Sequence, residues 1–294
     1  MKPAPFDYHR AEDVQHAVQL LGQLGPDAKL LAGGQSLVPL MNFRLARPSA
    51  LIDLNHVPGL AYIRRDGGRL RLGALARHAQ VEGAPAAAEA CPILAEAMKQ
   101  VGHAAIRARG TVGGSIAHAD PAAELPLLAV VFDGQVAVQA ETGQRTIDAR
   151  DFFVDALLTA LEPHEMVVEV SLDSSRPWTG SAFLELSRRH GDFAIVSAAV
   201  LIEEREGRCR DVRIAIGGAN PVPFRATLAE GSLREQKPTG ADLREAAALA
   251  AQRCDPPSDV HGSSDYRRQL VRVLVYRALN QALGRDYRRA EAAA

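Results

Sequence analysis

Residues 31–48 read LAGGQSLVPLMNFRLARP. The run Lys29–Ala32 predicts a short buried strand that leads into the glycine pair Gly33-Gly34 and then into an apolar segment. A second apolar run, LIDL at residues 51–54, predicts another strand. The amphipathic spacing from Val14 to Leu21 predicts a helix ahead of both strands. Two strands and a glycine-rich turn in so short a stretch indicate a compact α+β unit.

A second glycine pair lies further along, in residues 107–126, which read RARGTVGGSIAHADPAAELP. Glycine pairs let the backbone take positive φ values and bring amide groups close to a ligand. Consecutive free amides form an anion-binding nest, and the serine that ends each motif adds a hydroxyl donor. Neither motif has the GxGxxG or GK[ST] pattern, so we expect a phosphate or pyrophosphate site of another kind.

The remaining sequence divides at the polar stretch 173–177, DSSRP. Before it, we expect a helical region over 84–101 and strands at 69–72, 135–139 and 166–172. After it, we expect strands at 182–186, 196–204 and 212–217, the last two joined by a hairpin turn at Glu206-Gly207. Helices are predicted over 241–252 and 266–283. The expected domains are therefore residues 1–176, with subdomains of about 1–55 and 56–176, residues 177–288, and a tail at 289–294.

Composition excludes several classes of protein. The formal net charge of -1 argues against a general nucleic-acid binder, which carries a basic surplus. No run of about 18 apolar residues is present to span a bilayer, and the first residues lack the apolar core of a signal peptide. We therefore expect a cytoplasmic protein. Its three cysteines are too few and too far apart for a metal clip or an iron–sulfur cluster, and no histidine motif predicts a metal site.

Both long motifs resemble the FAD-binding medium subunit of molybdenum hydroxylases, the carbon monoxide dehydrogenase and xanthine dehydrogenase group. The similarity extends over nearly the whole chain and includes PFDY at residues 5–8 and GDFAIV at residues 191–196. It implies a two-subdomain FAD-binding fold of the vanillyl-alcohol-oxidase/PCMH type. A small C-terminal α+β domain, an antiparallel sheet with helices, would follow.

The resemblance also implies which residues bind the cofactor. The two motifs would hold the FAD pyrophosphate from two sides, Glu124 stands where the family usually has an aspartate, and the backbone of Val167 would face the adenine. Phe193 matches an aromatic position beside the isoalloxazine, often tyrosine; the alternative is a plain core phenylalanine. A lysine is common near Glu185, so a contact from that strand stays open. The implied cofactor-binding residues are Ala32, Gly33, Gly34, Gln35, Ser36, Thr111, Val112, Gly113, Gly114, Ser115, Glu124, Val167 and Phe193.

By this resemblance the chain is the electron-transfer subunit of a molybdenum-dependent hydroxylase or dehydrogenase. A large subunit would carry molybdopterin, a small subunit two [2Fe–2S] clusters, and non-covalent FAD in this chain would pass electrons to an external acceptor. The complex is expected to be a dimer of heterotrimers. Two alternatives are a free-standing FAD oxidoreductase and a non-catalytic assembly protein that has lost FAD. The sequence does not identify the substrate.

Overall fold

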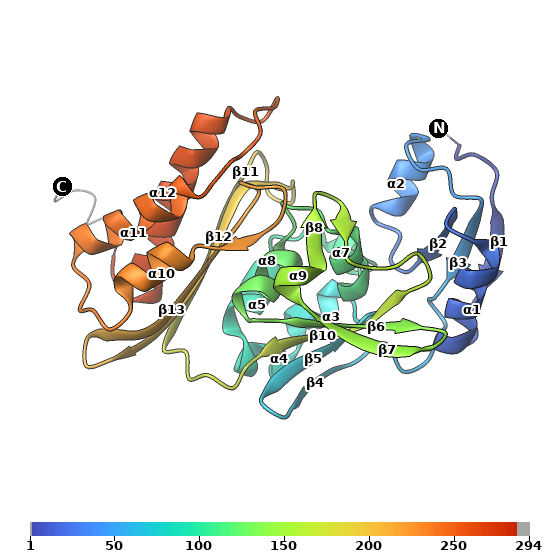
Figure 1. Cartoon of the computed structure of the whole chain (residues 1–294), viewed down its shortest axis with the longest axis horizontal. Helices are drawn as coiled ribbons and strands as arrows, with labels where there is room; N and C mark the ends of the chain where they lie inside the picture. The colour runs from blue at the N-terminus through green and yellow to red at the C-terminus, as the bar shows by residue number, and fades with distance from the viewer. Residues whose placement is uncertain (1, 287–294) are drawn as a thin grey trace.

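The computed structural model describes residues 2–286, and the expected tail at 289–294 lies outside this range. Three units lie side by side, from the N-terminal strands at one end to the helices α10–α12 at the other (Figure 1). Each unit is built on its own β-sheet. The mixture of helices and strands confirms the α+β class predicted from the sequence.

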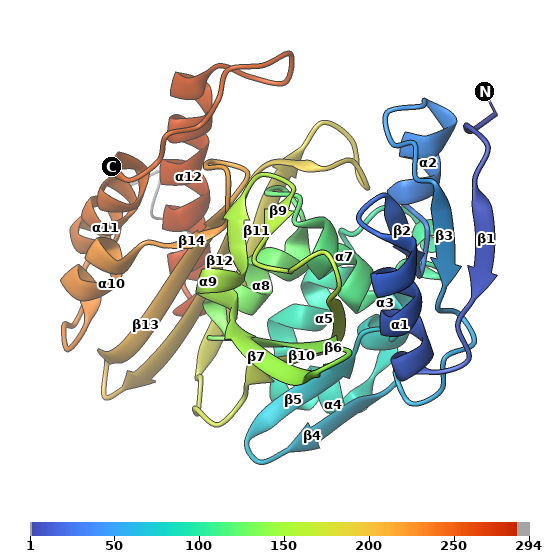
Figure 2. The same ribbon diagram turned by 45° about the vertical axis from the view of Figure 1, so that its right-hand side comes forward.

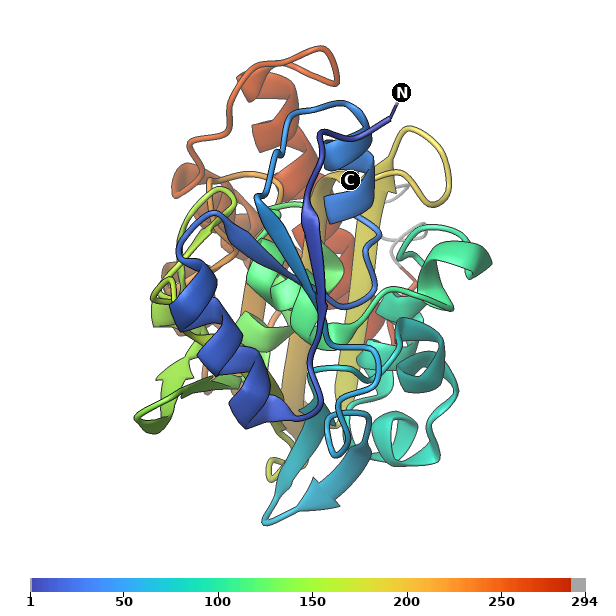
Figure 3. The same ribbon diagram turned by 90° about the vertical axis from the view of Figure 1, so that its right-hand side faces the viewer.

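The N-terminal unit is a three-stranded parallel sheet in the order β1-β3-β2. The helix α1 begins at the N-cap Asp13, whose carboxylate accepts a hydrogen bond from the amide of His16 at 2.7 Å. It buries Ala17, Val18 and Leu21, and it runs beside the sheet strands (Figure 3). The elements are β1 (Asp7–Arg10), α1 (Val14–Leu24), β2 (Ala28–Leu31), α2 (Leu37–Asn42) and β3 (Ala50–Asp53). The apolar segment after the first glycine pair is thus the helix α2, and this crossover makes β2 and β3 parallel.

The middle unit is a five-stranded antiparallel sheet in the order β4-β5-β10-β6-β7, with a separate β8-β9 pair. Its strands are β4 (Ile63–Asp66), β5 (Arg69–Gly73), β6 (Gln135–Ala140), β7 (Gly143–Asp148), β8 (Phe153–Asp155), β9 (Leu158–Thr159) and β10 (Met166–Asp173). Its helices are α3 (His78–Gly83), α4 (Pro85–Ala90), α5 (Pro92–Met98), α6 (Ala104–Arg107), α7 (Val112–His118), α8 (Glu124–Val131) and α9 (Ala149–Phe152).

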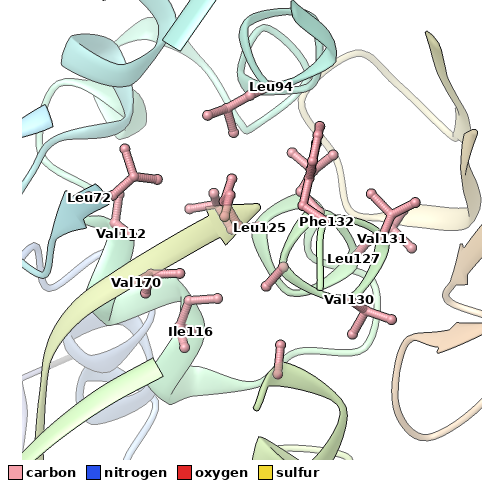
Figure 4. Packing of buried hydrophobic residues seen from close by; sticks show 14 of the residues in the cluster. Leu72, Leu94, Val112, Ile116, Leu125, Leu127, Val130, Val131, Phe132 and Val170 are labelled. Atoms are coloured by element: carbon pink, nitrogen blue, oxygen red, sulfur yellow. The ribbon is translucent and has the colours of Figure 1, made fainter. Parts of the chain in front are cut away.

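The helix α8 is the centre of the middle core. Every one of its residues is buried, including Glu124, as expected for a helix that is apolar all round. Leu125, Leu127 and Val130 pack with Ile116 of α7 and Val170 of β10 (Figure 4). The region expected to be helical over 84–101 contains the two short helices α4 and α5, because Pro92 starts a new one.

The C-terminal unit is a four-stranded antiparallel sheet in the order β11-β12-β13-β14. Its elements are β11 (Gly180–Ser187), β12 (Ala194–Arg205), β13 (Arg208–Gly217), β14 (Phe224–Arg225), α10 (Thr227–Leu233), α11 (Gly240–Gln252) and α12 (Ser264–Ala282). The predicted hairpin turn is present, with positive φ at Glu206 and Gly207. One face of the sheet joins the middle core through Phe183, Ala199 and Ala215, and α10–α12 cover the other face (Figure 2).

A buried arginine connects the middle and C-terminal units. Arg213 of β13 is 3% exposed and forms an ion pair with Asp133 at 2.7 Å. It also donates to the carbonyl oxygen of Val131, and its guanidinium lies 4.9 Å from the ring centroid of Trp178. Asp133 and Val131 belong to the middle unit, so this cation holds the C-terminal sheet against the end of α8.

We predict that Arg213→Met lowers the free energy of unfolding by about 2 kcal/mol, because it removes a buried guanidinium with its hydrogen bonds to Val131 and Asp133, whereas Asp133 keeps its ion pairs with Arg150 and Arg225. Arg210→Met is the matched control: its pair with Glu235 is largely exposed and should contribute less than about 1 kcal/mol. Urea denaturation followed by circular dichroism measures both variants. Equal destabilisation of the two would contradict the assigned role of Arg213.

Candidate functional site

The first glycine motif forms an open loop between β2 and α2. Gly34 has a φ of 71°, the left-handed conformation that glycine adopts without strain. Among the described residues, the four consecutive amides of Gly33, Gly34, Gln35 and Ser36 find no acceptor in the protein. A row of free amides is an anion-binding nest. The loop lines a cavity of about 360 Å³, together with residues that include Asn55 and Arg109.

The two glycine motifs meet at Gly33. A Cβ atom on this residue would overlap the carbonyl oxygen of Arg109 and lie 2.9 Å from the Cα of Gly110. Gly33 has no positive φ, so what requires glycine here is this close approach and not its backbone conformation. The chain just before Thr111 is therefore pressed against the anion nest.

Arg77 holds this contact in place. Its guanidinium donates to the carbonyl oxygen of Arg109 and, at 2.6 Å, to the side-chain oxygen of Asn55. The side-chain amide of Asn55 donates in turn to the carbonyl oxygen of Ala32 at 2.9 Å and to Asp53 at 2.6 Å. Arg77 and Asn55 thus connect both motifs through hydrogen bonds. Neither residue belongs to a recognisable motif, and only the tertiary structure reveals them.

The second motif is the start of a helix, which differs from the expected loop. Thr111 is the N-cap of α7, and its hydroxyl accepts from the amide of Gly114 at 3.2 Å. The amides of Val112 and Gly113 donate to the carbonyl oxygens of Ala76 and Ala74, and that of Ser115 donates to Thr111. The backbone amides of 112–115 are thus engaged within the protein. Gly114 remains exposed, and the hydroxyl of Ser115 has no partner among the described residues.

His78 contacts the second motif through the backbone of Thr111. Its Nε2 lies 3.0 Å from the carbonyl oxygen of Thr111, and because that oxygen can only accept, Nε2 carries the hydrogen. Burial lowers the pKa of His78 to about 4. The imidazole is therefore neutral near neutral pH. No sequence pattern distinguishes this histidine from the other histidines of the chain.

Glu124 lies at the first position of α8 and is 7% exposed. Burial and the nearby charge of Glu185 raise the pKa of Glu124 to about 8. Asp120 shapes the turn ahead of α8, because its carboxylate accepts from the amide of Ala122 at 2.9 Å. By resemblance, Glu124 stands where the family usually has an aspartate, and the structure gives it an environment that favours the protonated acid.

The two remaining candidates lie apart from the nest. Val167 is buried in β10 opposite Val138 of β6, so only its backbone is available. Phe193 is 60% exposed, which excludes the alternative of a core phenylalanine. It lines a cavity of about 930 Å³ between the middle and C-terminal units, with Asp120 and Arg188 also in the wall.

Other chemistries have little support in the part of the chain that the structure describes. No group of three or more His, Cys, Asp or Glu side chains could hold a metal ion. Cys91, Cys209 and Cys254 are all buried as free thiols. The helices of residues 2–286 include none long and apolar enough to cross a membrane.

Comparisons with known proteins agree with this geometry. The family described as "FAD binding domain in molybdopterin dehydrogenase" matches residues 4–173, and "CO dehydrogenase flavoprotein C-terminal domain" matches residues 181–282. The chain is 44% identical to the 6-hydroxypseudooxynicotine dehydrogenase complex subunit alpha of Paenarthrobacter nicotinovorans, over 97% of each chain. It is 39% identical to the nicotine 6-hydroxylase medium subunit of the same organism, over 96% of this chain and 99% of the relative.

A solved structure is also similar to this chain over nearly its whole length. Carbon monoxide dehydrogenase from Hydrogenophaga pseudoflava, in a form lacking the Mo-pyranopterin moiety, superposes with a TM-score of 0.94 at 38% identity. The match covers 97% of this chain and 99% of that chain. Because the likeness spans all three units, it concerns the whole architecture and not an isolated motif.

We predict that acid weakens the fold through His78. Its pKa falls from 6.5 to about 4 on folding, so the unfolded chain takes up this proton first as the pH drops. Stability from this group is complete above pH 6.5 and is lost towards pH 4, by about 3 kcal/mol in total. The variant His78→Gln keeps an N–H donor for Thr111 without titrating. Urea unfolding at several pH values should therefore show that the free energy of unfolding falls less steeply with acid in the variant than in the wild type. The same fall in both proteins would contradict this assignment.

Proposed function

The chain belongs to the family of FAD-binding medium subunits of molybdenum hydroxylases, and from this premise we propose how it works. It accepts electrons from [2Fe–2S] clusters of a partner subunit and passes them through FAD to an external acceptor. The substrate bond is made and broken elsewhere in the complex. FAD, when bound, would accept electrons one at a time and release them as a pair. The chain binds and orients this cofactor.

One observation carries the proposal: the open row of amides from Gly33 to Ser36. A pyrophosphate is doubly charged and rich in acceptors, so it suits a row of four N–H donors that have no acceptor in the protein. The loop also has no room for a side chain at Gly33, because the backbone of Arg109 lies against this residue. The residues present therefore fit the cofactor of the family.

The second motif contributes in a different way. We assign its exposed face, Gly114 and the hydroxyl of Ser115, to the cofactor, whereas the amides of Val112 and Gly113 hold α7 to the loop after β5. Thr111, Val112 and Gly113 thus act as positioning residues. Glu124, the backbone of Val167 and the ring of Phe193 keep their predicted roles along the cofactor, and the exposure of Phe193 suits a side chain that covers a flat ring.

Partners are part of the proposal. We place the metal centres of the complex on other subunits. We propose a large molybdopterin subunit, a small [2Fe–2S] subunit, non-covalent FAD and a cytoplasmic dimer of heterotrimers. We propose that residues 1–176 and 177–288 form the two domains.

The names of the relatives suggest where to look for a substrate. Two of them, at 44% and 39% identity, are named for 6-hydroxypseudooxynicotine and for nicotine, respectively. We therefore place N-heteroaromatic compounds first in a substrate panel. The large subunit would recognise them, so residues of this chain affect electron delivery and not substrate choice.

We predict that Gly33→Ala weakens FAD binding at least tenfold, about 1.4 kcal/mol, because the methyl group must push the two motifs apart. Gly231→Ala in α10 is the control, since a Cβ atom there meets nothing within 4 Å. Titration of the apoprotein with FAD, followed by flavin fluorescence, measures both. Wild-type affinity in the Gly33→Ala protein would rule out the nest as the pyrophosphate site.

We predict that the chain expressed alone binds FAD, is reduced by dithionite and oxidises no N-heteroaromatic compound. Isolated from its native cells with an affinity tag, it should bring two further polypeptides, together with molybdenum and iron. Metal analysis, flavin spectra and a dye-reduction assay test these points. Full turnover by a metal-free native preparation would instead support a free-standing oxidoreductase.

A further inference from the structure

Two carboxyl groups without a cation lie between α8 and the C-terminal sheet. Glu124 begins α8, and Glu185 lies within β11 on the same face as Phe183, which packs into the middle core. Both carboxylate oxygens of Glu185 are shielded from solvent and have no hydrogen-bond partner in residues 2–286. Buried carboxylates in proteins are normally paired or hydrogen-bonded, so this arrangement needs an explanation.

Ser197 points into the same layer. It lies opposite Glu185 in the β11-β12 pairing, it is fully buried, and its hydroxyl has no partner among the described residues. Its neighbour across β13 is Gly217, where a Cβ atom would lie 2.7 Å from Ser197 Oγ and 3.3 Å from the carbonyl oxygen of Pro121. The hydroxyl therefore faces the turn that leads into Glu124.

The surrounding charges do not neutralise these acids. The charged or titratable groups on the elements packed around them include Asp120 before α8, His118 of α7, Glu96 of α5, Lys99 directly after α5, and Arg267 of α12. Arg267 donates to the carbonyl oxygens of Ile195 and Gly218 and pairs with Asp259. Within residues 2–286, neither Glu124 nor Glu185 forms an ion pair.

A proton is the remaining way to stabilise the pair. Burial raises the pKa of Glu185 to about 7, and burial together with Glu185 raises the pKa of Glu124 to about 8. The charge of Glu185 disfavours ionisation of Glu124, so loss of a proton from one acid opposes loss of a proton from the other. Near neutral pH the pair holds at least one proton.

We propose that Glu124, Glu185 and Ser197 form a proton-holding site. This site takes up a proton when the flavin is reduced and releases it when the flavin is reoxidised. This inference rests on the proposed function. The turn Asp120–Ala122, which leads into Glu124, lines the same cavity of about 930 Å³ as Phe193, so Glu124 connects the site to the proposed flavin region.

The charge balance is simple. Bound FAD that gains two electrons and one proton carries one more negative charge than before. The carboxyl pair then takes one proton from water, which offsets that charge. When the external acceptor removes the two electrons, the pair returns this proton to water. The electrons come from the partner's clusters or, in a test on the isolated chain, from dithionite.

The first test asks whether the FAD-free chain holds the proton. Infrared spectroscopy at neutral pH should show the carbonyl stretch of a buried carboxylic acid in the wild type. The band should lose intensity in Glu124→Gln and in Glu185→Gln, and it should be unchanged in the control Glu89→Gln, whose carboxyl group is exposed on α4. Absence of the band from the wild type would overturn the proposal.

The second test asks whether the proton follows the flavin. We expect the FAD-loaded wild type to take up one more proton per two electrons than either glutamine variant between pH 7 and 8, the range set by the two raised pKa values. Spectroelectrochemical potentials measured against pH give this number, with Glu89→Gln again as control. Equal proton uptake in all four proteins would overturn the coupling while leaving FAD binding intact. A chain that shows the acid band but binds no FAD would contradict the proposed function, and the infrared result would still decide whether the pair holds a proton.

Discussion

The candidate site depends on one backbone contact, the approach of the Arg109 carbonyl to Gly33. Segments more than seventy residues apart in the chain meet there without room for a methyl group. Arg77 and Asn55 hold them together from the side through hydrogen bonds to Arg109 and Ala32. Because this contact joins the N-terminal sheet to the middle unit, the backbone of Arg109 borders the anion nest only when both units are folded and docked.

The two glycine motifs look alike in sequence but perform different tasks. In the first, four amides remain free, and the loop is available to an anionic ligand. In the second, Thr111 caps α7 and the following amides bind the loop after β5. One motif therefore offers donors, and the other supplies the rigid support against which the first is pressed. Rigid support of this kind is what keeps a cofactor in one orientation for electron transfer.

The boundary between the middle and C-terminal units contains two kinds of buried charged group. At one end, Asp133 forms ion pairs with Arg213 and Arg225 of the C-terminal sheet, and this cluster serves as an attachment point. At the other end, the acids Glu124 and Glu185 form no ion pair within residues 2–286, and the charge of Glu185 raises the pKa of Glu124. An unpaired acid pair costs stability, because burial favours the protonated forms. Its position behind the cavity that Phe193 lines indicates that this cost serves the chemistry of the site.

The sequence by itself determined the α+β class, the hairpin at Glu206-Gly207, the helix after Asp13 and the two glycine motifs, because each depends on local periodicity or on local backbone freedom. It also pointed to Glu124 and Phe193 through resemblance to a family. The tertiary structure alone decided which amides stay free, since that depends on acceptors such as Ala74 and Ala76 that lie far away in the chain. It likewise revealed Arg77, His78 and the pairing of Glu124 with Glu185, because hydrogen bonding and burial between distant segments leave no periodic signal in the sequence.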